Sequence, residues 1–138
     1  MKFKFLVAAA LLSAAAVTPG SAAPVTYLCE FQANTNTGWI PPQALYEIDQ
    51  EKGTATVFDA FVNLVHKKPI DVSMTEINSS KIRLKYPLVG IPVNGTGTAA
   101  TTYKINLDLG KNKANMSVTL HGFDNQAWGK GSCARQKK

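Results

Sequence analysis

The chain has 138 residues, with 15 Lys and Arg against 9 Asp and Glu, which gives a formal net charge of +6. This length excludes a large multidomain protein and is enough for one domain that buries its own core. After the first residues, no apolar stretch is long enough to cross a membrane as a helix.

The chain begins with the pattern of a secretory signal peptide. Lys2 and Lys4 give a positive start, and residues 5–17 form an apolar run that is broken only by Ser13. Small and helix-breaking residues follow, as they do before a signal cleavage site. The run is 13 residues long, whereas a membrane-spanning helix needs about 20. We therefore predict a removable leader rather than a membrane anchor.

Cleavage is predicted after Ala22, because cleavage after Ala23 would place a proline at the first mature position. Residues 1–22 are then the signal peptide and residues 23–138 form a single domain. The short, alanine-rich leader is typical of a bacterial envelope protein. We expect an exported protein, either periplasmic or extracellular, that does not span the membrane once mature.

Cys29 and Cys133 are the two cysteines of the chain. Outside the cytoplasm such a pair persists as a disulfide. A disulfide requires the two Cα atoms to be about 4.4–6.8 Å apart, so the start and the end of the mature chain must lie side by side. We predict a disulfide between the first and last strands.

The mature chain shows an apolar residue at every second position in most of its length, which indicates β-strands with one buried and one wetted face. Six such runs lie at 26–32, 46–49, 54–57, 82–86, 102–109 and 115–120. Turn-forming residues separate them by short connections. Residues 58–66 are rich in Phe and Val and suit a strand at least as well as a helix.

We therefore predict an all-β fold, an antiparallel meander of about seven or eight strands. Because the disulfide joins its ends, closure into a barrel is favoured over an open sandwich. The expected inward side chains are medium to large, which favours a filled interior over a hollow one. They are Tyr27, Phe31, Tyr46, Ile48, Val57, Leu84, Tyr86, Tyr103, Ile105, Leu107, Met116, Val118 and Leu120.

Basic residues gather in two places. Lys81, Arg83 and Lys85 alternate with apolar residues, as on the outward face of a strand. A second group, which includes Lys130 and Arg135, lies at the end of the chain. The simple interpretation is a solvated face and a frayed tail. The functional interpretation is attraction to an anionic membrane, nucleic acid or acidic polymer.

The sequence contains no strong signature of catalysis. His66 and His121 are the two histidines and are far apart, without the close-spaced ligands of a zinc site. No serine lies in a GxSxG motif. The glycine-rich residues 90–98 lack the Gly-Lys-Ser/Thr that closes a phosphate loop. We predict no metal and no cofactor.

Trp39 follows the first predicted strand and Trp128 precedes the last one, so a disulfide between these strands places both near one end of the barrel. They can form either a plug that seals the core or a mouth that binds a partner. With Lys130 and Arg135 they make the candidate binding surface.

The leading functional expectation is an exported, non-enzymatic domain that binds a partner or polymer through its loops. The expected partner is an envelope protein, an anionic polymer or a small apolar ligand, and no specific nucleic acid. Two alternatives remain open at this point. The first is a lipocalin-like carrier of a small ligand or lipid, and the second is a small hydrolase that uses His66 or His121.

Overall fold

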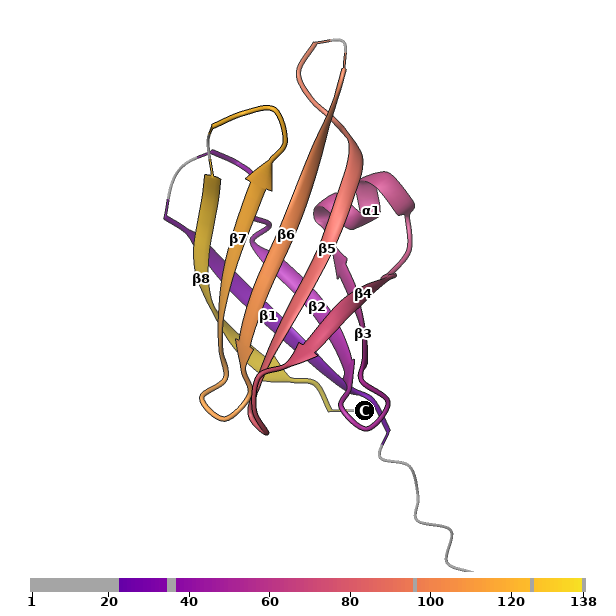
Figure 1. Ribbon diagram of the computed structural model, residues 1–138, viewed down its shortest axis with the longest axis vertical. Coiled ribbons are helices and arrows are strands. Elements are labelled where there is room, and N and C mark those ends of the chain that lie inside the picture. The colour runs from indigo at the N-terminus through magenta and orange to yellow at the C-terminus, as the bar shows by residue number, and fades with distance from the viewer. Residues whose placement is uncertain (1–22, 35–36, 96, 125, 138) are drawn as a thin grey trace, which may run out of the picture.

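The computed structural model describes residues 23–34, 37–95, 97–124 and 126–137. The predicted signal peptide, with its cleavage site after Ala22, lies outside these residues. Eight strands and one short helix follow each other in the described part of the chain (Figure 1). They are β1 (Val25–Ala33), β2 (Gln43–Asp49), β3 (Thr54–Asp59), α1 (Ala60–His66), β4 (Ile70–Glu76), β5 (Lys81–Pro92), β6 (Thr98–Asp108), β7 (Lys113–Leu120) and β8 (Gln126–Arg135).

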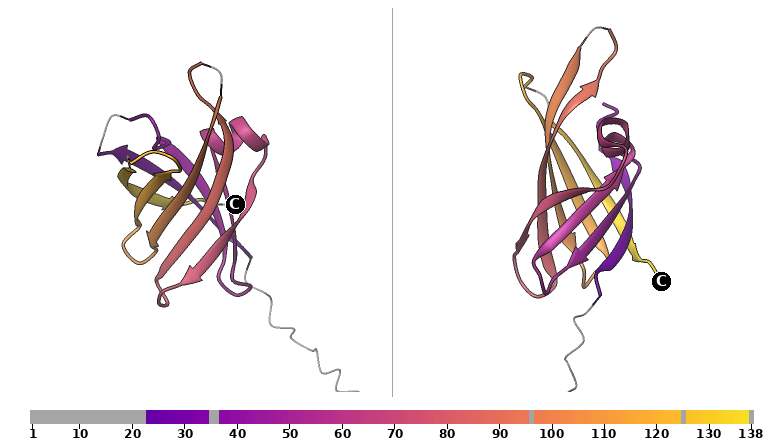
Figure 2. Two further views of the ribbon diagram at one scale, coloured as in Figure 1. Left: turned by 45° about the horizontal axis from the view of Figure 1, so that its top comes forward. Right: turned by 90° about the vertical axis from the view of Figure 1, so that its right-hand side faces the viewer.

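The strands form a closed antiparallel barrel in which every strand pairs with its neighbours in sequence. The last strand β8 returns to the first strand β1, in a register that runs from Tyr27 opposite Arg135 to Ala33 opposite Gly129. The prediction of an all-β meander closed into a barrel is therefore confirmed. Figure 2 shows the barrel from two further sides, with the β5–β6 hairpin extending beyond the other strands.

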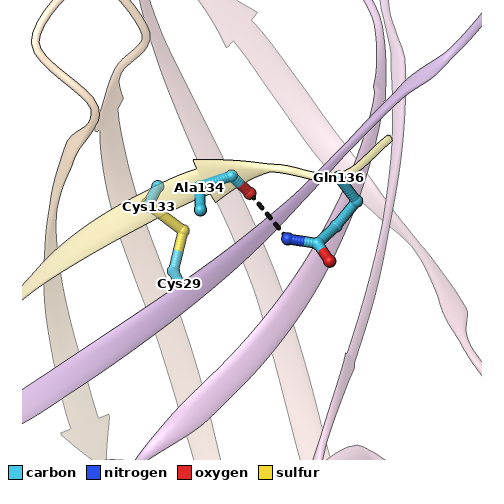
Figure 3. Close-up of a disulfide and its surroundings, with 4 residues drawn as sticks. All are labelled: Cys29, Cys133, Ala134 and Gln136. Atoms are coloured by element: carbon cyan, nitrogen blue, oxygen red, sulfur yellow. Dashed lines mark hydrogen bonds between the residues drawn. A yellow bond between two sulfur atoms is a disulfide. The ribbon is translucent and has the colours of Figure 1, made fainter. Parts of the chain in front are cut away.

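The disulfide between Cys29 and Cys133 is present, and the two residues lie directly opposite each other across the β1–β8 seam. Figure 3 shows the bond together with Gln136, whose side-chain amide donates to the Ala134 carbonyl oxygen at 3.1 Å. The backbone N–H of Gln136 also donates to the Thr26 carbonyl oxygen at 2.8 Å. The chain end is thus held against β1 beyond the disulfide. A disulfide of this kind indicates an oxidising compartment.

Side chains fill the barrel interior, as the alternation predicts. All thirteen residues that we expected to point inward are buried in the core. The largest are three tyrosines, Tyr46, Tyr86 and Tyr103, whose side chains are almost completely shielded from solvent. Medium-sized side chains from β5, β6 and β7 fill the remaining space. The interior is therefore a packed core.

Residues 58–66 differ from the strand that the sequence suggested. Strand β3 ends at Asp59, and α1 begins directly after it. The Asp59 carboxylate accepts a hydrogen bond from the Val62 N–H at 2.9 Å, which is a typical helix N-cap. Lys67 ends the helix in the left-handed conformation, with φ of 59°. The helix covers one end of the barrel, where the Val62 side chain is fully buried. The apolar residues of this segment therefore follow a helical period and not the period of a strand.

Strand β4 has no counterpart among the six predicted runs. It pairs with β3 from Val57 opposite Ile70 to Ala55 opposite Val72, and then with β5 through Ser73–Glu76. Its inward side chains are only partly buried. Its sequence does alternate, because Ile70, Val72 and Met74 stand between polar residues, so the prediction overlooked a run that the pattern offered.

Candidate binding surface

The outward side of β5 carries three cations in succession. Lys81, Arg83 and Lys85 are exposed, and the residues between them point into the core. The strand alternation thus places three positive charges about two residues apart on one wall of the barrel.

The neighbouring strands add cations to the same wall. Lys104 on β6 lies directly opposite Lys85. Lys113 on β7 lies opposite Asp108, and Lys130 on β8 lies opposite Asn115. We call the outward side of β5–β8 the basic face, defined by Lys81, Arg83, Lys85, Lys104, Lys113 and Lys130.

Charge is divided between the two halves of the barrel. Strands β5–β8 contain Asp108 as their one acidic residue. Strands β1–β4 contain neither Lys nor Arg. Their acidic residues are Glu30, Glu47, Asp49, Asp59, Asp71 and Glu76. A barrel with its charges separated in this way has a strong field across it and attracts an anion to one side.

Within the basic face, Lys81 and Lys113 both lie opposite Asp108, whereas Arg83, Lys85 and Lys104 have no acid directly opposite. Lys85 and Lys104 are like charges placed directly opposite each other, an arrangement that destabilises a sheet when nothing binds between them. Arg83 donates from Nε to the Asn106 side-chain oxygen at 2.9 Å. Because this partner is a neutral amide, the hydrogen bond orients the guanidinium group without neutralising its charge.

The surface is hollowed where β5–β8 meet β1. An open depression of about 1210 Å³ is lined by four lysines, by two amides and by one acid of this wall, which are Lys81, Lys111, Lys113, Lys130, Asn106, Asn115 and Asp108. Glu30, Gln32 and Gln43 line its other side. Lysines and amides around an open depression suit an extended partner that carries negative charge and hydrogen-bond acceptors.

The structure brings together two of the four predicted surface residues. Trp128 and Lys130 lie two residues apart on the outward side of β8, and Trp128 is 43% exposed. Trp39 instead lies at the covered end of the barrel, stacked on Phe61 with ring centroids 6.1 Å apart, and its carbonyl oxygen accepts from the Tyr103 hydroxyl at 3.1 Å. Trp39 therefore fits the plug interpretation, and Trp128 does not.

Arg135 lies apart from the basic face. It stands opposite Tyr27, in the register of the inward-pointing residues, at the end of β8 beyond the disulfide. Lys104 and Lys113 were not predicted as site residues, because their positions opposite Lys85 and Asp108 depend on strand register. The charge balance along the chain was a usable signal, since residues 81–138 contain ten Lys and Arg against two acidic residues.

The two histidines occupy separate exposed positions. His66 is the last residue of α1. The Nε2 atom of His121 lies 2.7 Å from the Thr102 hydroxyl oxygen on the exposed outer side of β6. Within the described part of the chain, no three His, Cys, Asp or Glu side chains come close enough to hold a metal ion.

A second polar cluster is buried inside the barrel, beneath α1. The Tyr86 hydroxyl donates to the Asp59 carboxylate at 3.3 Å, and the rings of Tyr86 and Tyr103 stack at 5.3 Å. The Tyr46 hydroxyl is buried without a hydrogen-bond partner. Burial raises the pKa of Asp59, although its bonds from the α1 backbone and Tyr86 oppose this. Burial, with the nearby Asp59 charge, also raises the pKa of Tyr46.

This cluster predicts that the stability difference between Asp59→Asn and wild type depends on pH, whereas Asp59→Asn and Asp59→Ala differ by the helix cap at every pH. Asn keeps the helix cap, whereas Ala loses it at a cost of about 1 kcal/mol. The raised pKa means that Asp59 favours folding below its ordinary pKa of 3.8 and that this contribution disappears as pH rises through the raised pKa. Urea unfolding should therefore show Asp59→Asn gaining stability over wild type as pH increases from 3 to 7. A difference that does not change with pH would contradict the charge argument.

Comparisons with known protein families, with curated proteins and with solved structures give no match for this chain. Over the residues that the structure describes, no helix combines the length and the hydrophobicity needed to cross a bilayer. We therefore infer the function from the charged surface of the barrel.

Proposed function

We propose that the protein is an exported, non-enzymatic binding domain that holds an anionic partner on its basic face. The observation that carries the proposal is the separation of charge, with six outward cations and one acid on β5–β8. This proposal moves the binding surface from the loops to a sheet. Export, to the periplasm or the medium, is supported by the predicted leader and by the disulfide.

The packed interior supports surface binding over the carrier alternative. The side chains of Tyr46, Tyr86 and Tyr103 occupy the space that a lipocalin-like ligand would need. The hydrolase alternative is weaker on geometric grounds. His121 contacts a threonine hydroxyl on an open surface, whereas a catalytic histidine is normally oriented by an acid within a cleft.

The Lys85–Lys104 pair offers a direct test, because one substitution should change binding and stability in opposite directions. In Lys85→Glu an acid faces Lys104, which should stabilise the sheet by about 0.2–1 kcal/mol. The same change replaces a cation of the basic face by an acid, so affinity for dextran sulfate should fall at least tenfold. Affinity of the wild type should also decrease steeply with added salt. Retention on immobilised dextran sulfate and urea unfolding measure the two effects.

Lys52→Glu is the matched control, since Lys52 lies in the β2–β3 turn and lines a separate depression with Glu47 and Asp71 of the acidic half of the barrel. It changes net charge by the same amount and should leave binding nearly unchanged. If both variants lose affinity equally, binding depends on overall charge and the basic face has no special role. If Lys85→Glu binds like wild type, the proposal is wrong.

A further inference from the structure

The β5–β6 hairpin projects beyond its neighbouring strands, and the end that projects has no charged residue in its sequence. From Tyr86 to Tyr103 the chain contains no acidic or basic residue and no histidine. Strand β4 pairs with β5 only as far as Lys85, and β7 ends opposite Thr101 on β6. The end of the hairpin therefore extends beyond both neighbouring strands, as Figures 1 and 2 show.

Apolar side chains are exposed on this hairpin and beside it. Val89 is 62% exposed, and Val93 at the turn is also exposed. Phe123 in the β7–β8 connection is 68% exposed, and the start of this connection is held to β6 by the His121 N–H, which donates to the Ala100 carbonyl oxygen at 3.0 Å. We call Val89, Val93 and Phe123 the apolar tip. Exposed apolar side chains at one end of a barrel are a candidate contact site.

The apolar tip continues the basic face. Along the outward side of β5, the cations Lys81, Arg83 and Lys85 are followed by Pro87 and then by Val89. The positive charges thus end where the exposed apolar side chains begin. A partner with uniform negative charge, such as an acidic polysaccharide, has nothing to place against the apolar half of this surface.

Trp128 lies at the boundary between the two halves. The strand register places it opposite Ser117, which faces Lys104, which in turn faces Lys85. A half-exposed tryptophan in line with lysines is typical of proteins at the membrane interface, where the ring occupies the headgroup level. Lys85, Lys104 and Trp128 lie in one row and the apolar tip lies beyond them, which matches the order of the headgroup region and the acyl chains in a bilayer.

We propose that the anionic partner is a lipid bilayer with anionic headgroups, and that the apolar tip inserts into it while the basic face contacts the phosphates. This inference rests on the proposed function and names the partner of the same site. It describes a protein that lies on the membrane surface. Leu64, exposed on α1 at the same end of the barrel, adds to the apolar contact.

The test compares vesicles with a polymer that has no apolar part. Wild type should co-sediment with vesicles of phosphatidylcholine mixed with phosphatidylglycerol, and only weakly with phosphatidylcholine alone. The variant Val89→Ser/Phe123→Ser should lose at least tenfold in vesicle affinity and keep its affinity for dextran sulfate. The matched control is Leu45→Ser, which removes an exposed apolar side chain on β2, away from the tip and from the depression, and should bind vesicles like wild type.

The outcomes separate this inference from the proposed function. If wild type binds dextran sulfate but not the mixed vesicles, the basic face stands and the bilayer is the wrong partner. If the tip variant binds vesicles as wild type does, insertion is wrong. If wild type binds neither probe, the proposed function fails as well. Circular dichroism of each variant confirms that a loss of binding is not a loss of folding.

Discussion

Replacing both cysteines with alanine should lower the free energy of unfolding by about 4–5 kcal/mol. The disulfide joins residues separated by 104 positions, and a loop of about 100 residues loses roughly 4.7 kcal/mol of unfolded-state entropy when closed. The free energy of unfolding of a small domain is only about 5–15 kcal/mol, so the disulfide contributes a large share of it. Alanine is preferred to serine because Cys29 is fully buried, and a serine hydroxyl there would lack a partner.

Urea unfolding of wild type with and without reductant, beside Cys29→Ala/Cys133→Ala, measures the effect. Reductant should weaken wild type nearly to the level of the double variant and should leave the double variant unchanged. A wild type that unfolds at the same urea concentration in both conditions would show that the β1–β8 seam is held without the covalent bond. The native backbone pairing predicts that the reduced barrel keeps its fold at low urea.

The alternation of apolar residues predicted most of this fold because the barrel has one inside and one outside. Each strand that buries a full face, such as β6 with Tyr103 and Ile105 inside, shows its period in the sequence. The disulfide then selected closure over a sandwich. Strand β4 was missed although Ile70, Val72 and Met74 alternate with polar residues. Helix α1 was missed because the seven residues that follow the Asp59 cap are too few to show a helical period that differs clearly from a strand period.

The candidate surface was only partly predictable. Trp128 and Lys130 lie on one strand, so their alternation shows that they share a face. The meeting of Lys85 with Lys104 depends on the β5–β6 register, and a shift by one residue would turn one of them inward. The projection of the hairpin depends on where β4 and β7 stop, which no local pattern in β5 or β6 reveals.

The meander determines where the charges of the chain lie on the barrel. Because consecutive strands are neighbours, the acidic residues of β1–β4 and the basic residues of β5–β8 become two opposite walls. In a fold with crossover connections the same sequence would mix the two signs. The meander therefore converts a simple asymmetry in composition into an oriented surface that can steer an anionic partner.

Gly131→Ala should destabilise the barrel by about 1–3 kcal/mol, which is the usual cost of forcing an extra methyl group into a packed site. Gly131 lies opposite Phe31 on β1, in the inward register. A Cβ atom there would stand 2.7 Å from the Glu30 carbonyl oxygen and 2.7 Å from the Phe31 ring. The β8 strand can approach β1 this closely because the residue has no side chain.

Gly110→Ala is the matched control, since the nearest atom to its added Cβ would be 3.5 Å away. Its effect should stay within about 0.5 kcal/mol. Combining Gly131→Ala with Phe31→Leu distinguishes the two contacts, because a smaller side chain relieves the ring contact and leaves the Glu30 oxygen in place. In urea unfolding we expect Phe31→Leu to remove only part of the destabilisation that Gly131→Ala causes. If the double variant is as stable as Phe31→Leu alone, the contact with the backbone oxygen has no energetic cost.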